Sequence, residues 1–191
     1  MLLKQVTGPQ AQVVSLTDVK ATPPAPISHS DDDLQIEFMI DAASRMIGEM
    51  SGRVLVPETW SVSFAFGEFS TVRLPKSPVT ALDSITYYDS DDVEQTASLS
   101  DFYFIADDDR ALVKPKESAT WPSANPHRED AITITFEAGY TTCPDPLKHA
   151  VTLTAKHFYD SGFAISSDRM YEVPLGVQAL IGVERLGWAA S

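Results

Sequence analysis

The chain has 191 residues, of which 43% are hydrophobic and 21% charged, and its formal net charge at pH 7 is −13. This length and apolar content suffice for one folded domain with a real core, and they argue against wholesale disorder. The negative charge argues against independent binding to a nucleic-acid backbone, which needs clustered Lys and Arg.

The sequence also indicates where the protein is made. Cys143 is the single cysteine, so no disulfide can form within the chain, and a reducing compartment is expected. The N-terminal residues lack the apolar run of a signal peptide, and no window approaches the roughly 20 apolar residues of a membrane span. We therefore expect a soluble protein made in the cytoplasm.

The N-terminal third is expected to be helical after an extended arm. The arm covers residues 1–14 and includes a short strand at residues 12–14. Ser15 caps one or two helical turns that end at Lys20. Three prolines then make residues 21–29 a stiff linker, since each proline lacks an N–H and restricts the residue before it.

The long helix is predicted at residues 30–53. Ser30 and Asp33 have the spacing of a capping box, and Gly52 can adopt the left-handed conformation that ends a helix. A core-facing stripe is formed by Ile36, Met39, Ile40, Ala43, Ile47 and Met50. The opposite side carries a second apolar line, Leu34, Phe38 and Ala42, which suggests contact with another subunit.

A β region follows the long helix. Trp60–Phe66 shows the two-residue alternation of a half-buried strand, and further short apolar segments are separated by turn residues such as Asp89–Asp92 and Asp107–Asp109. Strands are predicted at residues 60–66, 72–74, within 78–89, and at 93–97, 102–106, 111–114 and 131–138. They make an antiparallel β part over residues 57–142.

Helical periodicity returns at Asp145 and Pro146, which begin a helix that ends at Gly162. Residues 173–190 are apolar around most of the helix circumference, so this segment is expected to dock onto a partner. The predicted fold is α+β, a single domain made of a small helical bundle with an inserted antiparallel β-sheet domain. The helical part covers residues 1–56 and 143–191.

Catalytic and ligand-binding patterns are weak. The aspartate clusters lack the ligand spacing of calcium loops, and His149 and His157 lack zinc-motif spacing. Cys143 has no basic neighbour in sequence to activate it. We therefore expect no metal, no cofactor and no enzymatic activity. Paired carboxylates and tryptophans in the β part leave open a carbohydrate-binding or hydrolytic domain.

Four stretches resemble a known family, the head–tail connector (adaptor, head-completion) proteins of bacteriophages, prophages and gene transfer agents. They are SGRVLVPETWSVSF at residues 51–64, VRLPKSPVTALDSITYYDSDDVEQT at 72–96, FEAGYTTCPDPLKHAVTLTAKHFYDSG at 136–162, and VPLGVQALI at 173–181. Residues 15–20 also resemble the family's opening turn. Their order and spacing cover most of the chain.

The resemblance implies a ring of roughly twelve copies between the portal and the tail, closed by head-to-tail contacts. The expected partners are other copies, the portal protein and a tail-side stopper or terminator protein, with DNA only passing through. The implied portal-docking residues are Val173, Pro174, Leu175, Gly176, Val177, Leu180, Ile181 and Trp188. The second apolar line of the long helix is the expected subunit interface.

The resemblance also implies a location and leaves an alternative. The protein would be assembled in the host cytoplasm and then reside in the neck of a virion or phage-like particle, without contact with a membrane. A tail-side stopper or completion protein of the same neck is the alternative within this class. The acidic composition would let DNA slide through the ring rather than bind.

Overall fold

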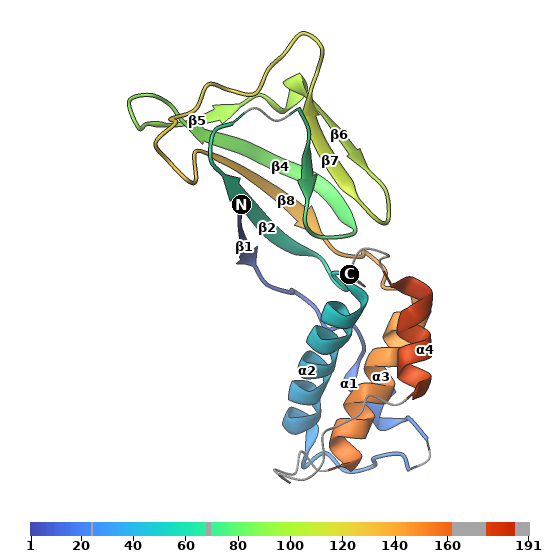
Figure 1. Ribbon diagram of the computed structural model, residues 1–191. Coiled ribbons are helices and arrows are strands. Elements are labelled where there is room, and N and C mark those ends of the chain that lie inside the picture. The colour runs from blue at the N-terminus through green and yellow to red at the C-terminus, as the bar shows by residue number, and fades with distance from the viewer. Residues whose placement is uncertain (24, 68–69, 162–174, 186–191) are drawn as a thin grey trace. The chain divides into compact units, whose positions relative to one another are not determined.

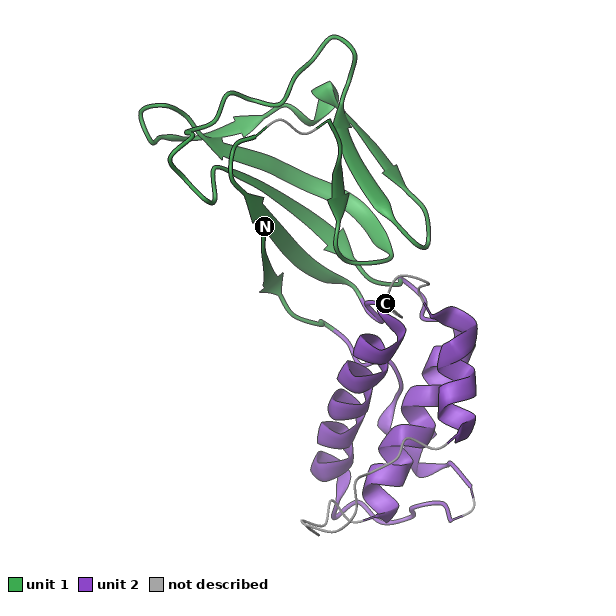
Figure 2. Cartoon of the chain, viewed as in Figure 1, with its two compact units in different colours: residues 1–10, 57–140 green, residues 11–56, 141–191 purple. Residues whose placement is uncertain are grey.

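The computed structural model describes residues 1–23, 25–67, 70–161 and 175–185. The chain divides into two compact units (Figure 2). The β unit consists of Met1–Gln10 and Pro57–Tyr140, and the helical unit consists of Ala11–Val56 and Thr141–Ser191. Helices and two antiparallel sheets confirm the predicted α+β class.

The helical unit is built around the long helix. Its elements are α1 (Leu16–Lys20), α2 (Asp33–Ser51), α3 (Asp145–Asp160) and α4 (Leu175–Glu184). Five of the six residues of the predicted stripe of α2, namely Ile36, Met39, Ile40, Ala43 and Ile47, are buried and form the core face, whereas Met50 is half-buried. α2 packs against α3, and α4 packs mainly against α3 (Figure 1). The predicted helix starting at Asp145 is likewise present.

The helix ends confirm two predictions, the Ser15 cap and the Gly52 end, and contradict a third. α1 has a capping box in which Ser15 and Asp18 bond to each other's backbone N–H, and α2 ends at Gly52 in the left-handed region at φ 74°. The capping box predicted between Ser30 and Asp33 is absent, and the residue before the first turn of α2 is Asp32. The Asp33 carboxylate instead accepts a 2.6 Å bond from Lys20, a partner distant in sequence.

The proline-containing linker is fixed at both of its ends. Lys20 Nζ donates to the backbone oxygen of His29, and the N–H of Ile27 donates to the backbone oxygen of Lys20 at 2.8 Å. Tyr159, near the end of α3, donates its hydroxyl to Asp32 at 2.8 Å, and this bond to a carboxylate raises the pKa of Tyr159. The first two bonds hold the two ends of the linker together, and the third joins the start of α2 to the end of α3.

The β unit contains two antiparallel sheets. The larger has the order β1-β2-β8-β4-β5, and the smaller has the order β3-β7-β6 (Figure 1). The strands are β1 (Leu2–Thr7), β2 (Glu58–Phe64), β3 (Val72–Leu74), β4 (Val79–Tyr88), β5 (Glu94–Ala97), β6 (Phe102–Ala106), β7 (Ala111–Pro115) and β8 (Ile132–Ala138). The strand predicted at residues 12–14 is wrong, and β1 lies instead where an extended arm was expected.

Alternation along the strands separates a core face from a polar face. On β8, Ile132, Ile134 and Phe136 are buried, whereas Thr133 and Thr135 are only partly covered. The same division runs across the sheet, because Ile134 lies opposite Val62 of β2 and Ile85 of β4, while Thr133 lies opposite Ser63 and Thr86. Trp121 lies between the core face and the smaller sheet. The centre of its ring is 6.1 Å from the ring centre of Phe64 in β2 and 5.0 Å from that of Phe102 in β6.

Arg128 links two loops at the end of the larger sheet through hydrogen bonds. Arg128 donates two 2.9 Å bonds to Asp130 and one to Asp92, and its guanidinium carbon lies 3.5 Å from the centre of the Tyr88 ring. The hydrogen bonds from Arg128 lower the pKa of Asp130. This cluster joins the β4–β5 turn to the loop before β8.

The two faces of β8 give a direct stability test. Ile134→Ala removes a fully buried side chain and should lower the free energy of unfolding by about 3 kcal/mol. Thr135→Ala, the next residue on the polar face, should cost less than about 1 kcal/mol. Urea denaturation of both variants measures the difference, and equal losses would contradict the assignment of the two faces.

Candidate functional site

The first candidate surface is the outer side of α2. Leu34 and Phe38 are each 73% exposed, and Ala42 is exposed as well. They lie one helical turn apart, so they form a continuous apolar line on the side opposite the core stripe. Acidic and basic side chains flank this line. Exposed large apolar residues that form such a line on one helix are typical of a protein–protein contact.

The second candidate surface is the outer side of α4. Of the predicted docking residues, Val177 and Ile181 are buried in the helical unit, Leu180 is half-buried, and Leu175 is 83% exposed. Gly176 is also exposed, and a Cβ added to it would meet no atom within 4 Å. The remaining predicted residues, Val173, Pro174 and Trp188, lie outside the described residues.

The sequence reasoning missed two residues near the end of α4, one exposed on this second surface and one buried beneath it. Val183 is 73% exposed and lies a little over two turns after Leu175, about 80° further around the exposed side of α4. Arg53 is 8% exposed and donates its Nε–H to the backbone oxygen of Glu184, the last residue of α4, at 2.9 Å. Arg53 therefore fixes the end of α4 to the segment after α2. Its position directly after the helix-ending Gly52 was the only signal in the sequence.

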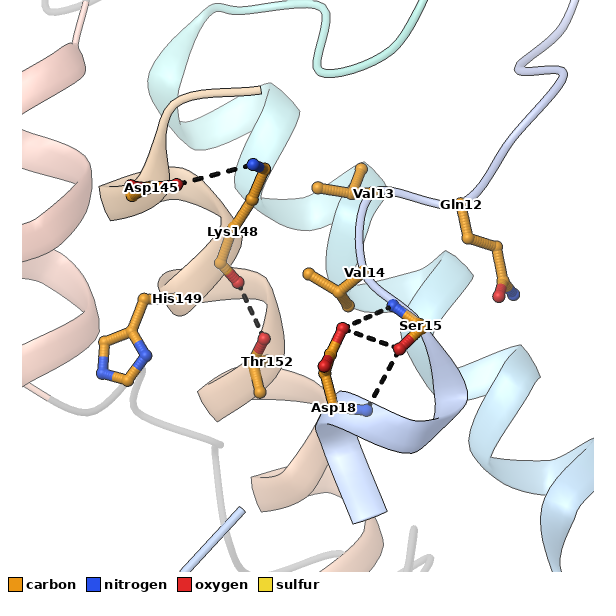
Figure 3. Close-up of a pocket in the computed structure, with 9 residues that line it drawn as sticks. All are labelled: Gln12, Val13, Val14, Ser15, Asp18, Asp145, Lys148, His149 and Thr152. Atoms are coloured by element: carbon orange, nitrogen blue, oxygen red, sulfur yellow. Dashed lines mark hydrogen bonds and ion pairs between the residues drawn. The ribbon is translucent and has the colours of Figure 1, made fainter. Parts of the chain in front are cut away.

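An open pocket of about 670 Å³ lies between the segment before α1 and the first turns of α3 (Figure 3). Its lining residues are Gln12, Val13, Val14, Ser15, Asp18, Asp145, Lys148, His149 and Thr152. The Ser15 hydroxyl donates to Asp18 at 2.6 Å and accepts the backbone N–H of Asp18 at 3.1 Å. This hydroxyl is used in capping α1, and no histidine of the lining is hydrogen-bonded to it, so the pocket lacks the arrangement of a nucleophile with its base.

The aspartate clusters act as turn formers. Asp89 accepts bonds from Gln95 and from the N–H groups of Asp91 and Val93, and these bonds lower its pKa. Asp107 accepts the N–H groups of Asp109 and Arg110, which lower its pKa in the same way. In the described part of the chain, no three His, Cys, Asp or Glu side chains lie close enough to hold a metal ion.

Two residues considered for chemistry have structural roles. Trp121 packs between Phe64 and Phe102 in the β unit and so does not form an exposed platform for a sugar. Cys143 is buried, and burial raises the pKa of its thiol to about 11. A thiol with such a pKa is protonated at neutral pH and is a poor nucleophile. None of the described helices is long and apolar enough to cross a membrane.

Solved structures from gene transfer agent (GTA) particles share this fold. A chain of the virion of a native GTA particle is 20% identical and has a TM-score of 0.78, with 97% of this chain and 95% of that chain covered. A chain from the neck of an empty GTA particle, computed with C6 symmetry, is 21% identical with a TM-score of 0.76 and the same coverage. A chain from the neck of a native GTA particle, computed with C12 symmetry, is 20% identical with a TM-score of 0.68, again with the same coverage.

The chain thus shares its α+β fold with chains of GTA particles. The sequence matches the model of the head completion protein family over residues 12–170, so the chain belongs to that family. This match confirms the resemblance found in the sequence. No curated protein matches the chain.

Cys143 provides a pH-dependent test. In the folded protein the thiol should react with a thiol reagent at pH 8 at least about tenfold more slowly than in denaturant, because it is buried and protonated. The raised pKa means that the folded state holds this proton more tightly than the unfolded state. Its stabilising contribution is therefore complete below pH 9 and is lost as the pH rises towards 11. Rapid modification at pH 8 without unfolding would contradict this environment.

Proposed function

We propose that this chain is a structural head–tail adaptor, of which many copies form a ring in the neck of a phage or phage-like particle. The ring sits between the portal and the tail and surrounds a channel through which DNA passes. The observation that carries this proposal is membership of the head completion protein family over most of the chain. The shared fold with GTA neck chains supports it.

The ring contact is assigned to the outer line of α2. Leu34 and Phe38 are exposed to water in a single copy. Burying each of them against a neighbouring copy would stabilise the contact by roughly 1.5–3 kcal/mol, and Ala42 would add a smaller apolar contact. A closed ring repeats one heterologous contact between successive copies. The C12 and C6 symmetries of the GTA neck reconstructions support this type of assembly.

The portal contact is assigned to α4 and its flanking residues. Val177 and Ile181 anchor the helix inside the helical unit, which leaves Leu175, Gly176 and part of Leu180 as the outer surface. The bond from Arg53 to Glu184 holds the end of this helix. Val173, Pro174 and Trp188 complete the proposed portal-docking set. The opposite end of the ring would meet a tail-side stopper or terminator protein.

The proposed role requires no reaction and no cofactor. The net charge of −13 supports a channel that DNA passes without binding tightly, since tight binding to the phosphate backbone needs clustered cations. The Ser15 hydroxyl in capping and the protonated Cys143 thiol support a structural rather than a catalytic role. Assembly would take place in the host cytoplasm, before the protein becomes part of the particle.

Substitution of Phe38 tests the ring contact. Phe38→Asp should leave the folded monomer unchanged, because the side chain is 73% exposed, but should weaken ring formation at least about tenfold. Phe38→Leu is the matched control, which keeps an apolar side chain and should assemble. Thermal unfolding and mass measurement separate the two effects. A large loss of monomer stability in Phe38→Asp would show that this residue belongs to the core.

Two substitutions in α4 test the portal contact. Leu175→Asp should preserve the fold and weaken co-purification with the portal protein at least about tenfold. Ile181→Asp should instead destabilise the helical unit by about 3–5 kcal/mol, because it places a charge in the core. Unchanged portal binding by a folded Leu175→Asp variant would contradict the assignment of this surface.

A further inference from the structure

Strand β1 has apolar side chains on both faces of the sheet edge that it forms. Its sequence is LLKQVT, and all six residues are exposed. Leu3 lies opposite the buried Val62 on the core side, whereas Leu2 lies opposite Ser63 on the polar side. A strand that is apolar on both faces is typical of strands covered on both sides. β1 is not covered in this way within the described part of a single chain.

The outer edge of β1 is also unprotected. It pairs with β2 along one side only, and no strand among the described residues pairs with its other side. Edge strands of soluble proteins usually carry prolines or several charges that prevent pairing with another chain. β1 contains no proline, and its one charged residue is Lys4. A bulge between Gln5 and Thr7 interrupts the regular pairing only at one end.

The opposite edge of the same sheet is β5, which is also free on its outer side among the described strands (Figure 1). All four neighbouring pairs in this sheet are antiparallel, so β1 and β5 have the same sense in the strand order, while the twist of the sheet turns their directions apart. Rotation between neighbours in a ring of about twelve is about 30°, so each strand keeps its sense from one copy to the next. A pair formed by β1 of one copy and β5 of the next would therefore be parallel in sense, and the junction would have to absorb the twist of the sheet.

The charges of the two edges are complementary. Residues 1–10 contain no acidic side chain, whereas β5 and the turn before it contain Asp89, Asp91, Asp92 and Glu94. Lys4 lies opposite Ser61 on the polar side of the sheet. Thr96 of β5 lies opposite Thr86 on the same polar side of the sheet. Glu94, two residues before Thr96, also points to the polar side. Lys4 and Glu94 would thus lie on the same face of the junction.

We propose that β1 of one copy pairs with β5 of the next copy and so joins the five-stranded sheets of neighbouring copies. This inference rests on the proposed ring of identical copies and adds a contact in the β unit to the contact assigned to α2. The pairing would satisfy the free backbone groups of both edges and would draw Leu2 and Leu3 away from water.

Engineered cysteines test this pairing in assembled particles. Within one chain Lys4 and Glu94 are separated by four strand spacings, roughly 19 Å, which exceeds the reach of about 7 Å for a disulfide. Any cross-link between these positions is therefore between copies. Lys4→Cys would be combined with Glu94→Cys or with Thr96→Cys, in a Cys143→Ala background, and the particles would be oxidised and analysed by non-reducing electrophoresis.

At least one of the two pairs should give a ladder of multimers. The matched control is Gln5→Cys with Glu94→Cys, because Gln5 lies opposite Trp60 on the core side and should give no ladder. If the particles contain the chain but neither cysteine pair gives a ladder, the β1–β5 pairing is overturned and the proposed function is not. Dimers from Lys4→Cys by itself would overturn it in favour of a two-fold β1–β1 contact. A chain absent from the particles would overturn the proposed function and the pairing together.

Discussion

The packing of one helix stripe is the constraint on which the helical unit depends. The buried residues of α2 provide the surface against which α3 packs, and α4 completes the layer through Val177 and Ile181. Because this stripe of aliphatic and Met side chains is held in the core, the opposite side of α2 must face away from the helical unit. Leu34 and Phe38 are exposed as a consequence of that packing and not through any looseness of the helix.

The same logic holds for the other surfaces. α4 is apolar on most sides, and burial of one side leaves Leu175 and Val183 in water. β1 adds an apolar edge to a sheet whose core face is already filled. Each unit thus exposes apolar groups that a monomeric protein would rarely retain. The proposed ring and its contact with the portal would give all of these groups a physical role.

Much of this fold could be predicted from the sequence, because periodicity is a local property. The stripe of α2, the alternation in β8 and the turns at Asp89 and Asp107 follow from residues close in the chain. β1 was missed because its apolar residues do not alternate, and the cap of α2 was wrong because Asp33 bonds to Lys20, which lies in another helix.

The candidate surfaces could be predicted only in part. The line on α2 was visible because polar residues separate it from the core stripe. In α4 both sides are apolar, so periodicity separates Leu175 from Val177 without telling which of them is buried. The role of Arg53 depends on the end of a helix more than a hundred residues away, which no local pattern contains.

The central claim is that copies of this chain form a ring in a particle neck, and a single-particle reconstruction of that neck tests it most directly. Particles carrying a tagged form of the chain would be purified and imaged. The account predicts density for a closed ring of copies between the portal and the tail, with the outer side of α2 buried between neighbours. A neck without this chain, or a single copy without ring symmetry, would contradict it.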